Sequence, residues 1–227
     1  MRQRVLRVRE VFFDFEGTLV DFQWQLIPAV KDSLAALVKA GFKEEWYGDD
    51  PNYATIFNHT FDLIQKGKGD PSLITDIVGN IYDRYDAEAL SCWNRYPETI
   101  EVLETLRKMG FSLGIISNIG EKSLTAALEK LDLAGRVGVV VSRNEVKRLK
   151  PDPEGLINAA ETLKVDPAQA IFVGDSRKDV QAARKAGMLA GYLRGGEDPA
   201  QSLFEYPADI EIENLGQLPP LLSRLTS

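Results

Sequence analysis

The stretch Val11-Phe12-Phe13-Asp14-Phe15-Glu16-Gly17-Thr18-Leu19 decides the fold. It begins as an apolar, β-forming run and ends in two carboxylates, a glycine and a threonine, which is the pattern of a buried strand with polar groups at its carboxyl end. Open parallel sheets bind ligands just beyond the carboxyl ends of their strands. Asp14 is therefore placed to act on a ligand, although a strand followed by an ordinary turn has the same local pattern.

A second segment repeats this design later in the chain. Ala170-Ile171-Phe172-Val173-Gly174-Asp175-Ser176-Arg177-Lys178-Asp179 is an apolar strand followed by two acids at the start of a helix. Between the two segments lie another strand end, Gly114-Ile115-Ile116-Ser117-Asn118, and a loop, Arg148-Leu149-Lys150-Pro151. These sites together supply carboxylates, a hydroxyl, an amide and an ammonium.

Strands and helices alternate regularly after residue 93. We expect strands at 111–116, 137–141, 171–173, 189–193 and around 210–212, and helices at 97–109, 121–131, 153–163, 180–186 and from 215 onward. Such alternation is typical of a parallel sheet covered by helices. The predicted fold class is α/β, with a Rossmann-like parallel sheet as the core.

Residues 20–93 differ in character from the rest of the chain. Amphipathic runs separated by Gly- and Pro-containing breaks occur at 29–40, 53–65 and 72–85. Runs of this kind predict a small helical bundle inserted into the core. The expected domains are an α/β core, residues 1–19 and 94–227, and a helical domain, residues 20–93.

Composition and charge exclude several kinds of partner. The chain has 227 residues, of which 44% are hydrophobic, so it can bury one sizeable core. Its net charge of -7 is opposite to the basic surplus that nucleic acids and anionic membranes attract, so we expect neither as a partner. The single cysteine, Cys92, excludes an intramolecular disulfide and a cysteine-based metal cluster. No signal peptide or long apolar span stands out, and the expected location is the cytoplasm.

The motifs, taken in order, resemble the haloacid dehalogenase-like hydrolase superfamily. Its phosphatases carry an Asp-x-Asp-Gly-Thr nucleophile motif, a Ser or Thr, a Lys, and a Gly-Asp-x-x-x-Asp metal motif. The resemblance covers nearly the whole chain. It implies a Mg²⁺-dependent phosphatase that hydrolyses a small phosphorylated metabolite through an aspartyl-phosphate, acting as a monomer or a homodimer. One position departs from the motif, because Glu16 stands where the superfamily usually has Asp, as it also does in enolase-phosphatases.

The resemblance implies a role for each polar group. Asp14 is the expected nucleophile, Glu16 the proton donor and acceptor, and Lys150 the fixed countercharge. The expected phosphate-binding residues are Thr18, Ser117, Asn118 and Lys150. The expected Mg²⁺ site is formed by Asp14, Asp175 and Glu16, where a backbone carbonyl near Glu16 supplies an oxygen ligand. Asp179 is expected to act behind the ligands, by holding Lys150 or a metal-bound water.

The inserted helices resemble a cap that closes over the active site and contributes to substrate choice. Candidates for substrate contacts are Trp24, Trp46, Tyr47, Tyr53, Lys68 and Trp93. The alternative for each aromatic residue is the core of the helical bundle, and for Lys68 it is a solvated loop.

Other functions stay open on the sequence alone. A haloacid dehalogenase would use Asp14 on carbon without a metal, but such a site gains nothing from the extra acids Asp175 and Asp179. A phosphomutase would need a cap that keeps water from the aspartyl-phosphate. A binding or regulatory protein would keep the phosphate pocket and turn over poorly because of Glu16. Taken singly, Asp175 and Asp179 also fit a helix cap, and Lys150 fits a surface lysine.

Overall fold

The computed structural model describes residues 8–198 and 206–226, and its core is a six-stranded parallel sheet. The strands are β1 (Glu10–Phe13), β2 (Ser112–Ile116), β3 (Val139–Val141), β4 (Ala170–Gly174), β5 (Leu189–Leu193) and β6 (Ile210–Ile212). Their order in the sheet is β3-β2-β1-β4-β5-β6, so β1 lies at the centre, where the direction of the strand order reverses. Ligands bind at such a reversal in open α/β sheets. The predicted α/β fold class is confirmed.

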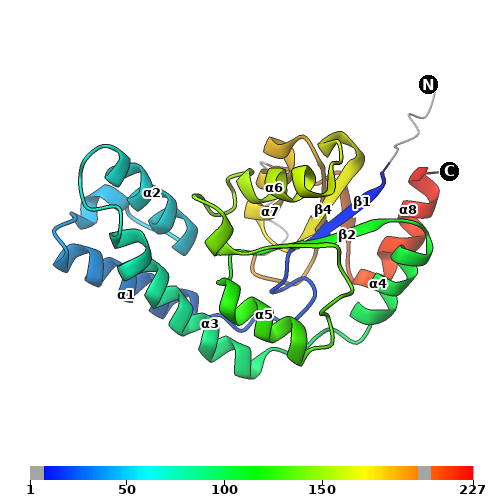
Figure 1. Ribbon diagram of the computed structural model, residues 1–227, viewed down its shortest axis with the longest axis horizontal. Helices are drawn as coiled ribbons and strands as arrows, with labels where there is room; N and C mark the ends of the chain where they lie inside the picture. Colours follow the sequence, from blue (N-terminus) through cyan, green and yellow to red (C-terminus); the bar gives the residue numbers. More distant parts are fainter. Residues whose placement is uncertain (1–7, 199–205, 227) are drawn as a thin grey trace.

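Helices cover both faces of the sheet (Figure 1). They are α4 (Thr99–Lys108), α5 (Glu121–Lys130), α6 (Glu154–Leu163), α7 (Arg177–Ala186) and α8 (Leu218–Thr226). Successive side chains of a strand point to opposite faces, and β1 shows the result. Val11 and Phe13 belong to one apolar cluster and Phe12 to the other, with all three fully buried. The last three residues of the central strand are thus apolar on both faces, and Asp14 is the first polar residue after them.

The helices inserted after β1, which we call the cap, form a separate group beside the sheet in Figure 1. They are α1 (Leu26–Lys39), a short 3-10 turn (Glu44–Tyr47), α2 (Tyr53–Gln65), a π-helical turn (Ile74–Gly79) and α3 (Asn80–Cys92). Val20 and Arg95 form an isolated antiparallel bridge, so the chain enters and leaves the cap at the same place. The division into two domains at residues 20 and 93 stays a prediction, and residues 1–7 of the predicted core lie outside the described residues.

The third helical run differs from the sequence prediction. The expected run at 72–85 begins as the π-helical turn at Ile74 and continues as α3 to Cys92. The apolar pattern breaks after Tyr85 because Asp86, a charged residue, lies on the buried face of α3. Asp86 is only 1% exposed and is neutralised there by Arg143 of the core, so a polar residue continues a buried helix face.

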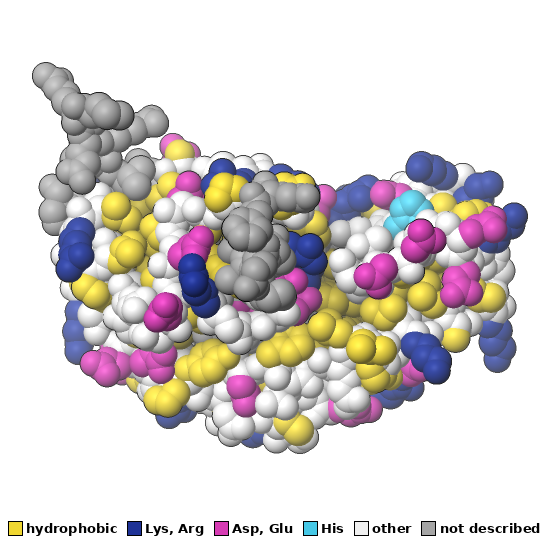
Figure 2. Space-filling view, turned by 180° about the vertical axis from the view of Figure 1, so that it is seen from behind, with side chains coloured by type: hydrophobic (Ala, Val, Ile, Leu, Met, Phe, Trp, Pro, Cys, Tyr) yellow, Lys and Arg dark blue, Asp and Glu magenta, His cyan; other side chains and the backbone are white. Residues whose placement is uncertain are grey.

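The surface and the helix lengths bear on possible partners. On the face shown in Figure 2, acidic and basic side chains are interspersed over both the core and the cap. This mixture differs from the continuous basic stripe that is typical of nucleic-acid-binding faces. Among residues 8–198 and 206–226, none of the helices combines the length and the apolar character that crossing a bilayer requires.

Two of the contacts that hold the cap against the core are well buried or partly buried. At the first, the side-chain amide of Asn58 in α2 accepts from the N–H of Leu149 at 2.7 Å and donates to the carbonyl of Leu149 at 2.8 Å. At the second, Arg143 pairs with Asp86 of α3 at 2.7 Å. Leu149 directly precedes Lys150, so the first contact fixes the backbone beside a predicted site residue.

We expect Asn58→Ala to lower the free energy of unfolding by about 2–4 kcal/mol, because the buried backbone groups of Leu149 lose both side-chain partners. Urea denaturation measures the change. The control is Asn158→Ala in α6, where the amide makes one longer bond of 3.3 Å, to the carbonyl of Glu145. We expect the control to stay within about 0.5 kcal/mol of the unsubstituted protein. An equal effect of both substitutions contradicts a specific role of Asn58 in holding the cap.

Candidate active site

The loop after β1 places Asp14 at the carboxyl end of the central strand. The N–H of Asp14 donates to the carbonyl of Val173 at 2.9 Å, which extends the pairing of β1 with β4. Gly17 has a φ of +80°, and a Cβ at this position would lie 2.2 Å from Oδ2 of Asp175. Glycine is thus needed both for the turn and for the close approach of the two strand ends. The hydroxyl of Thr18 donates to Oδ1 of Asp175 at 3.2 Å and ties the same loop to β4.

Lys150 lies between two carboxylates at the centre of the site. Its ammonium donates to Oδ1 of Asp14 at 2.5 Å and to the carbonyl of Ile116 at 3.1 Å, and lies 2.7 Å from Oδ1 of Asp179. Burial by itself lowers the pKa of Lys150, but the two carboxylates outweigh burial and hold this pKa above its usual value. Burial raises the pKa of Asp14 to about 6, even with Lys150 beside it. At neutral pH the site therefore holds a charged lysine against an ionised Asp14.

Asp179 has two roles that the sequence offered as alternatives. Its Oδ2 accepts from the N–H of Ser176 at 3.1 Å and from the hydroxyl of Ser176 at 2.6 Å, which forms a capping box at the start of α7. Its Oδ1 pairs with Lys150. Burial by itself raises the pKa of Asp179, but the ion pair and the hydrogen bonds lower it below the usual value. One carboxylate thus caps a helix and orients the lysine of the site.

Three buried carboxylates converge beside this lysine. Oxygens of Asp14, Asp175 and Asp179 all lie within 4.8 Å of one another. Burial, and then the charges of the other two carboxylates, raise the pKa of Asp175 well above its usual value. A divalent cation relieves such repulsion, and an all-oxygen set of carboxylates suits Mg²⁺, so the residues present fit this ion. The carboxylate of Glu16 is not part of the group of three, and a metal contact near its backbone carbonyl stays a prediction.

The side chain of Glu16 is held by donors from the start and the end of the cap. Its Oε1 accepts from the N–H of Gln23, the N–H of Trp24 and the indole N–H of Trp93, each at 2.7 Å. Burial raises the pKa of Glu16 to about 8, although the three donors oppose this shift. The carboxyl group is therefore mostly protonated at neutral pH. Trp93, a candidate for substrate contact, is 1% exposed and packs edge-on against Phe15. Its indole N–H donates to Glu16 and is therefore already occupied.

Most of the predicted site residues line one cavity. Those that line it are Asp14, Glu16, Ser117, Asn118, Lys150 and Asp179. Asn118 is tied to the lysine loop, because its Oδ1 accepts from the N–H of Lys150 at 3.0 Å. Two predicted residues are absent from the lining. Thr18 and Asp175 lie beneath it, fully or almost fully buried, and bond to each other.

The cavity also has lining residues that the sequence reasoning missed. They are Phe22, Ile119, Ser176, Lys178 and Glu197. Lys178 and Glu197 form an ion pair, and the ammonium of Lys178 lies 5.2 Å from the ring centre of Tyr53. Lys178 falls within the quoted acid motif, between Asp175 and Asp179, so its position in the first turn of α7 was a usable signal. Glu197 belongs to a loop, and no periodic pattern marks it.

The geometry defines the class of protein. A carboxylate after the central strand, a lysine between two acids and helices inserted after β1 together indicate a hydrolase built on an α/β core. The chain belongs to the haloacid dehalogenase-like hydrolase family, whose sequence model matches residues 11–191. The predicted family is confirmed, and the protein is an enzyme of the hydrolase class.

Individual relatives are phosphatases by name. The phosphoglycolate phosphatase of Salmonella paratyphi A is 30% identical over 237 residues, which cover 96% of this chain and 94% of the relative. That of Escherichia coli O157:H7 is 30% identical over 233 residues, with coverage of 95% and 92%. The crystal structure of a haloacid dehalogenase-like hydrolase from Bacteroides fragilis superposes with a TM-score of 0.68 at 27% identity, and covers 93% of this chain and 99% of its own.

Proposed function

We propose that this protein is a Mg²⁺-dependent phosphatase that hydrolyses a small phosphomonoester through an aspartyl-phosphate on Asp14. The observation that carries the proposal is the contact of Lys150 with both Asp14 and Asp179 at the edge of a cavity. An ammonium there neutralises phosphate oxygens while it orients the nucleophile. The names of the relatives support the same activity.

In the first step an oxygen of Asp14 attacks phosphorus, and the bond between phosphorus and the leaving oxygen breaks. Glu16 gives its proton to that oxygen, so the alcohol leaves neutral. A pKa of about 8 keeps the proton on Glu16 until it is needed. A Mg²⁺ ion held by Asp14, Asp175 and the backbone near Glu16 would supply positive charge against the anionic phosphate.

In the second step Glu16, now a carboxylate, takes a proton from water. The water oxygen attacks phosphorus, the bond between phosphorus and Asp14 breaks, and inorganic phosphate leaves. Lys150 stays paired with Asp179 throughout, so its position does not depend on the charge of Asp14. Ser117 and Asn118, which line the cavity after β2, supply hydrogen-bond donors to the phosphate oxygens.

The test is phosphate release from p-nitrophenyl phosphate by protein that has been treated with EDTA and dialysed. We expect release only after Mg²⁺ is added, with a loss again when EDTA is in excess. Halide release from 2-chloropropionate, assayed in parallel, detects a dehalogenase. Release that ignores both EDTA and Mg²⁺ contradicts the metal-dependent mechanism. Failure to release phosphate from this ester and from a panel of sugar and short-acid phosphates, with Mg²⁺ still bound in calorimetry, favours the binding-protein alternative.

A further inference from the structure

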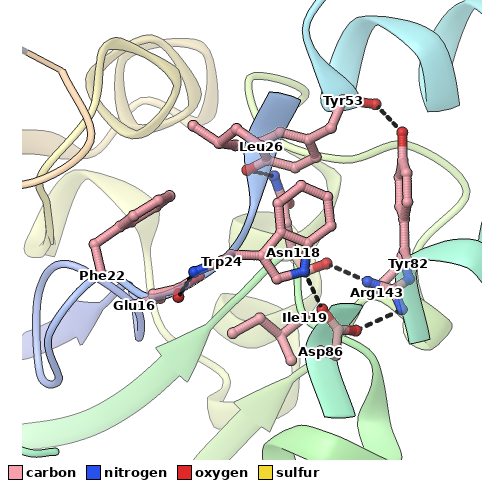
Figure 3. Close-up of a pocket in the computed structure, with 10 residues that line it drawn as sticks. All are labelled: Glu16, Phe22, Trp24, Leu26, Tyr53, Tyr82, Asp86, Asn118, Ile119 and Arg143. Carbon is pink, nitrogen blue, oxygen red and sulfur yellow. Dashed lines mark hydrogen bonds and ion pairs between the residues drawn. The ribbon is translucent and has the colours of Figure 1, made fainter. Parts of the chain in front are cut away.

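A second, small pocket shares part of its lining with the first, and Figure 3 shows the residues that line it. Its lining residues are Glu16, Phe22, Trp24, Leu26, Tyr53, Tyr82, Asp86, Asn118, Ile119 and Arg143. Half of these also line the cavity that contains Asp14, namely Glu16, Phe22, Tyr53, Asn118 and Ile119. Glu16, the proposed proton donor to the leaving oxygen, thus belongs to both. A phosphate beside Asp14 would direct its alcohol half toward the second cavity.

The second cavity is lined mainly by aromatic and aliphatic side chains. The ring of Trp24 lies 5.0 Å from that of Tyr53 and 5.4 Å from that of Tyr82, between ring centres. Phe22 and Leu26 are partly exposed, and Ile119 is buried. Trp24 and Tyr82 are themselves mostly buried, so the apolar lining that stays partly exposed comes from Phe22, Leu26 and Tyr53. Contact with these side chains removes apolar surface from water, which favours an apolar or aromatic ligand.

Each charged group in this lining already has a partner. Arg143 pairs with Asp86 at 2.7 Å and with Asp83, and it donates to the carbonyl of Asn118 at 2.8 Å. Asp86 accepts further bonds from the indole of Trp24 at 2.8 Å and from the N–H of Gly120 at 2.9 Å. Figure 3 shows Arg143 and Asp86 facing each other at one side of the cavity.

In the part of the chain that the structure describes, the cavity beside Asp14 adds no free cation to this lining. Within residues 8–198 and 206–226, its basic lining residues are Lys150, which lies between two carboxylates, and Lys178, which pairs with Glu197. A carboxylate on the alcohol half of a substrate would be desolvated here without a cation of its own, which is unfavourable.

We propose that the alcohol half of the substrate is uncharged and apolar, preferably aromatic, and occupies this second cavity. The proposal rests on the phosphatase function proposed above and specifies its substrate class. The proposed substrate differs from phosphoglycolate, the compound for which the relatives are named. The alcohol half of phosphoglycolate carries a carboxylate. Specificity for the phosphate stays with Asp14 and Lys150, and specificity for the alcohol falls to Trp24, Tyr53 and Leu26.

The first experiment compares kcat/KM for matched phosphate esters in the presence of Mg²⁺. Benzyl phosphate is set against its 4-carboxy derivative, and 2-hydroxyethyl phosphate against phosphoglycolate. We expect each uncharged ester to exceed its carboxylated partner at least about tenfold, and benzyl phosphate to be the best of the four. Equal or faster hydrolysis of the carboxylated esters overturns the substrate inference and leaves the phosphatase function intact. Phosphate release from none of them contradicts the phosphatase function itself.

A second experiment adds a free cation to the aromatic cavity. Leu26→Arg places a guanidinium in its lining, and we expect the ratio of kcat/KM for phosphoglycolate over benzyl phosphate to rise at least about tenfold. The matched control is Ile27→Arg, because Ile27 is the next residue of α1, is 82% exposed and does not line the cavity. The control should leave the ratio unchanged. A ratio that moves equally in both variants, or in neither, overturns the assignment of the alcohol half to this cavity.

Discussion

Asp14→Asn is expected to abolish phosphate release, with a fall in kcat of at least about 10⁴-fold, because the amide cannot form the aspartyl-phosphate. The same change should leave the free energy of unfolding equal or higher. Burial and the charge of Asp179 disfavour the ionised Asp14, as its raised pKa of about 6 indicates, and Lys150 keeps its pair with Asp179 at 2.7 Å. Loss of activity without loss of stability is typical of a group retained for function.

The measurement pairs steady-state phosphate release with urea denaturation of the metal-free protein. Asp166→Asn is the control, since Asp166 caps a short 3-10 helix before β4, and asparagine caps a helix about as well. It should match the unsubstituted protein in both assays. If Asp14→Asn retains more than a tenth of the activity, another group is the nucleophile. If it unfolds several kcal/mol more easily, the lost activity says nothing about chemistry.

The parallel sheet and most of the candidate site follow from local patterns. Apolar runs that end in polar residues predicted β1, β2 and β4, and their parallel pairing brings Asp14, Ser117 and Asp175 to one edge of the sheet. Lys150 was predicted from its loop motif alone. The structure brings its ammonium within 2.5 Å of Asp14, and a surface position is excluded because the side chain is only 5% exposed.

The long-range contacts that position Glu16 and the backbone beside Lys150 could not be predicted from the sequence. Trp93 donates to Glu16 across 77 residues, and Asn58 binds the backbone of Leu149 across 91. No periodic pattern marks such pairs, since each depends on how the cap is placed against the core. The same holds for Asp86, whose burial beside Arg143 interrupts the apolar pattern of α3. Tertiary contacts here override the local signal.

Glu16 shows how a departure from a motif is accommodated. The side chain is one methylene longer than Asp, and the donors at Gln23, Trp24 and Trp93 meet it at the place where the cap joins the core. The proposed proton donor is therefore positioned by the cap as well as by the loop after β1. A change in the cap that moved Trp93 would alter proton transfer without any contact with phosphate.

Glu16→Gln is expected to lower kcat by about 10²–10⁴-fold, since the amide still accepts from the three donors but carries no transferable proton. It should also change how stability depends on pH. In the metal-free protein Glu16 has a pKa of about 8, against an ordinary value of 4.5. Between these values the folded chain keeps a proton that the unfolded chain releases, so the stability from Glu16 is full below about pH 4.5 and is lost as pH rises through 8.

As pH rises through this window, the unsubstituted protein should therefore lose unfolding free energy relative to Glu16→Gln, by about 1.4 kcal/mol per pH unit. The raised pKa values of Asp14 and Asp175 act with the same sign, but they are present in both proteins and largely cancel. Glu161→Gln, on an exposed position of α6, serves as the control and should run parallel to the unsubstituted protein. If the curve of Glu16→Gln is parallel as well, Glu16 is ionised in the folded state and cannot be the proton donor, and the acid that protonates the leaving oxygen must then come from the substrate or from water.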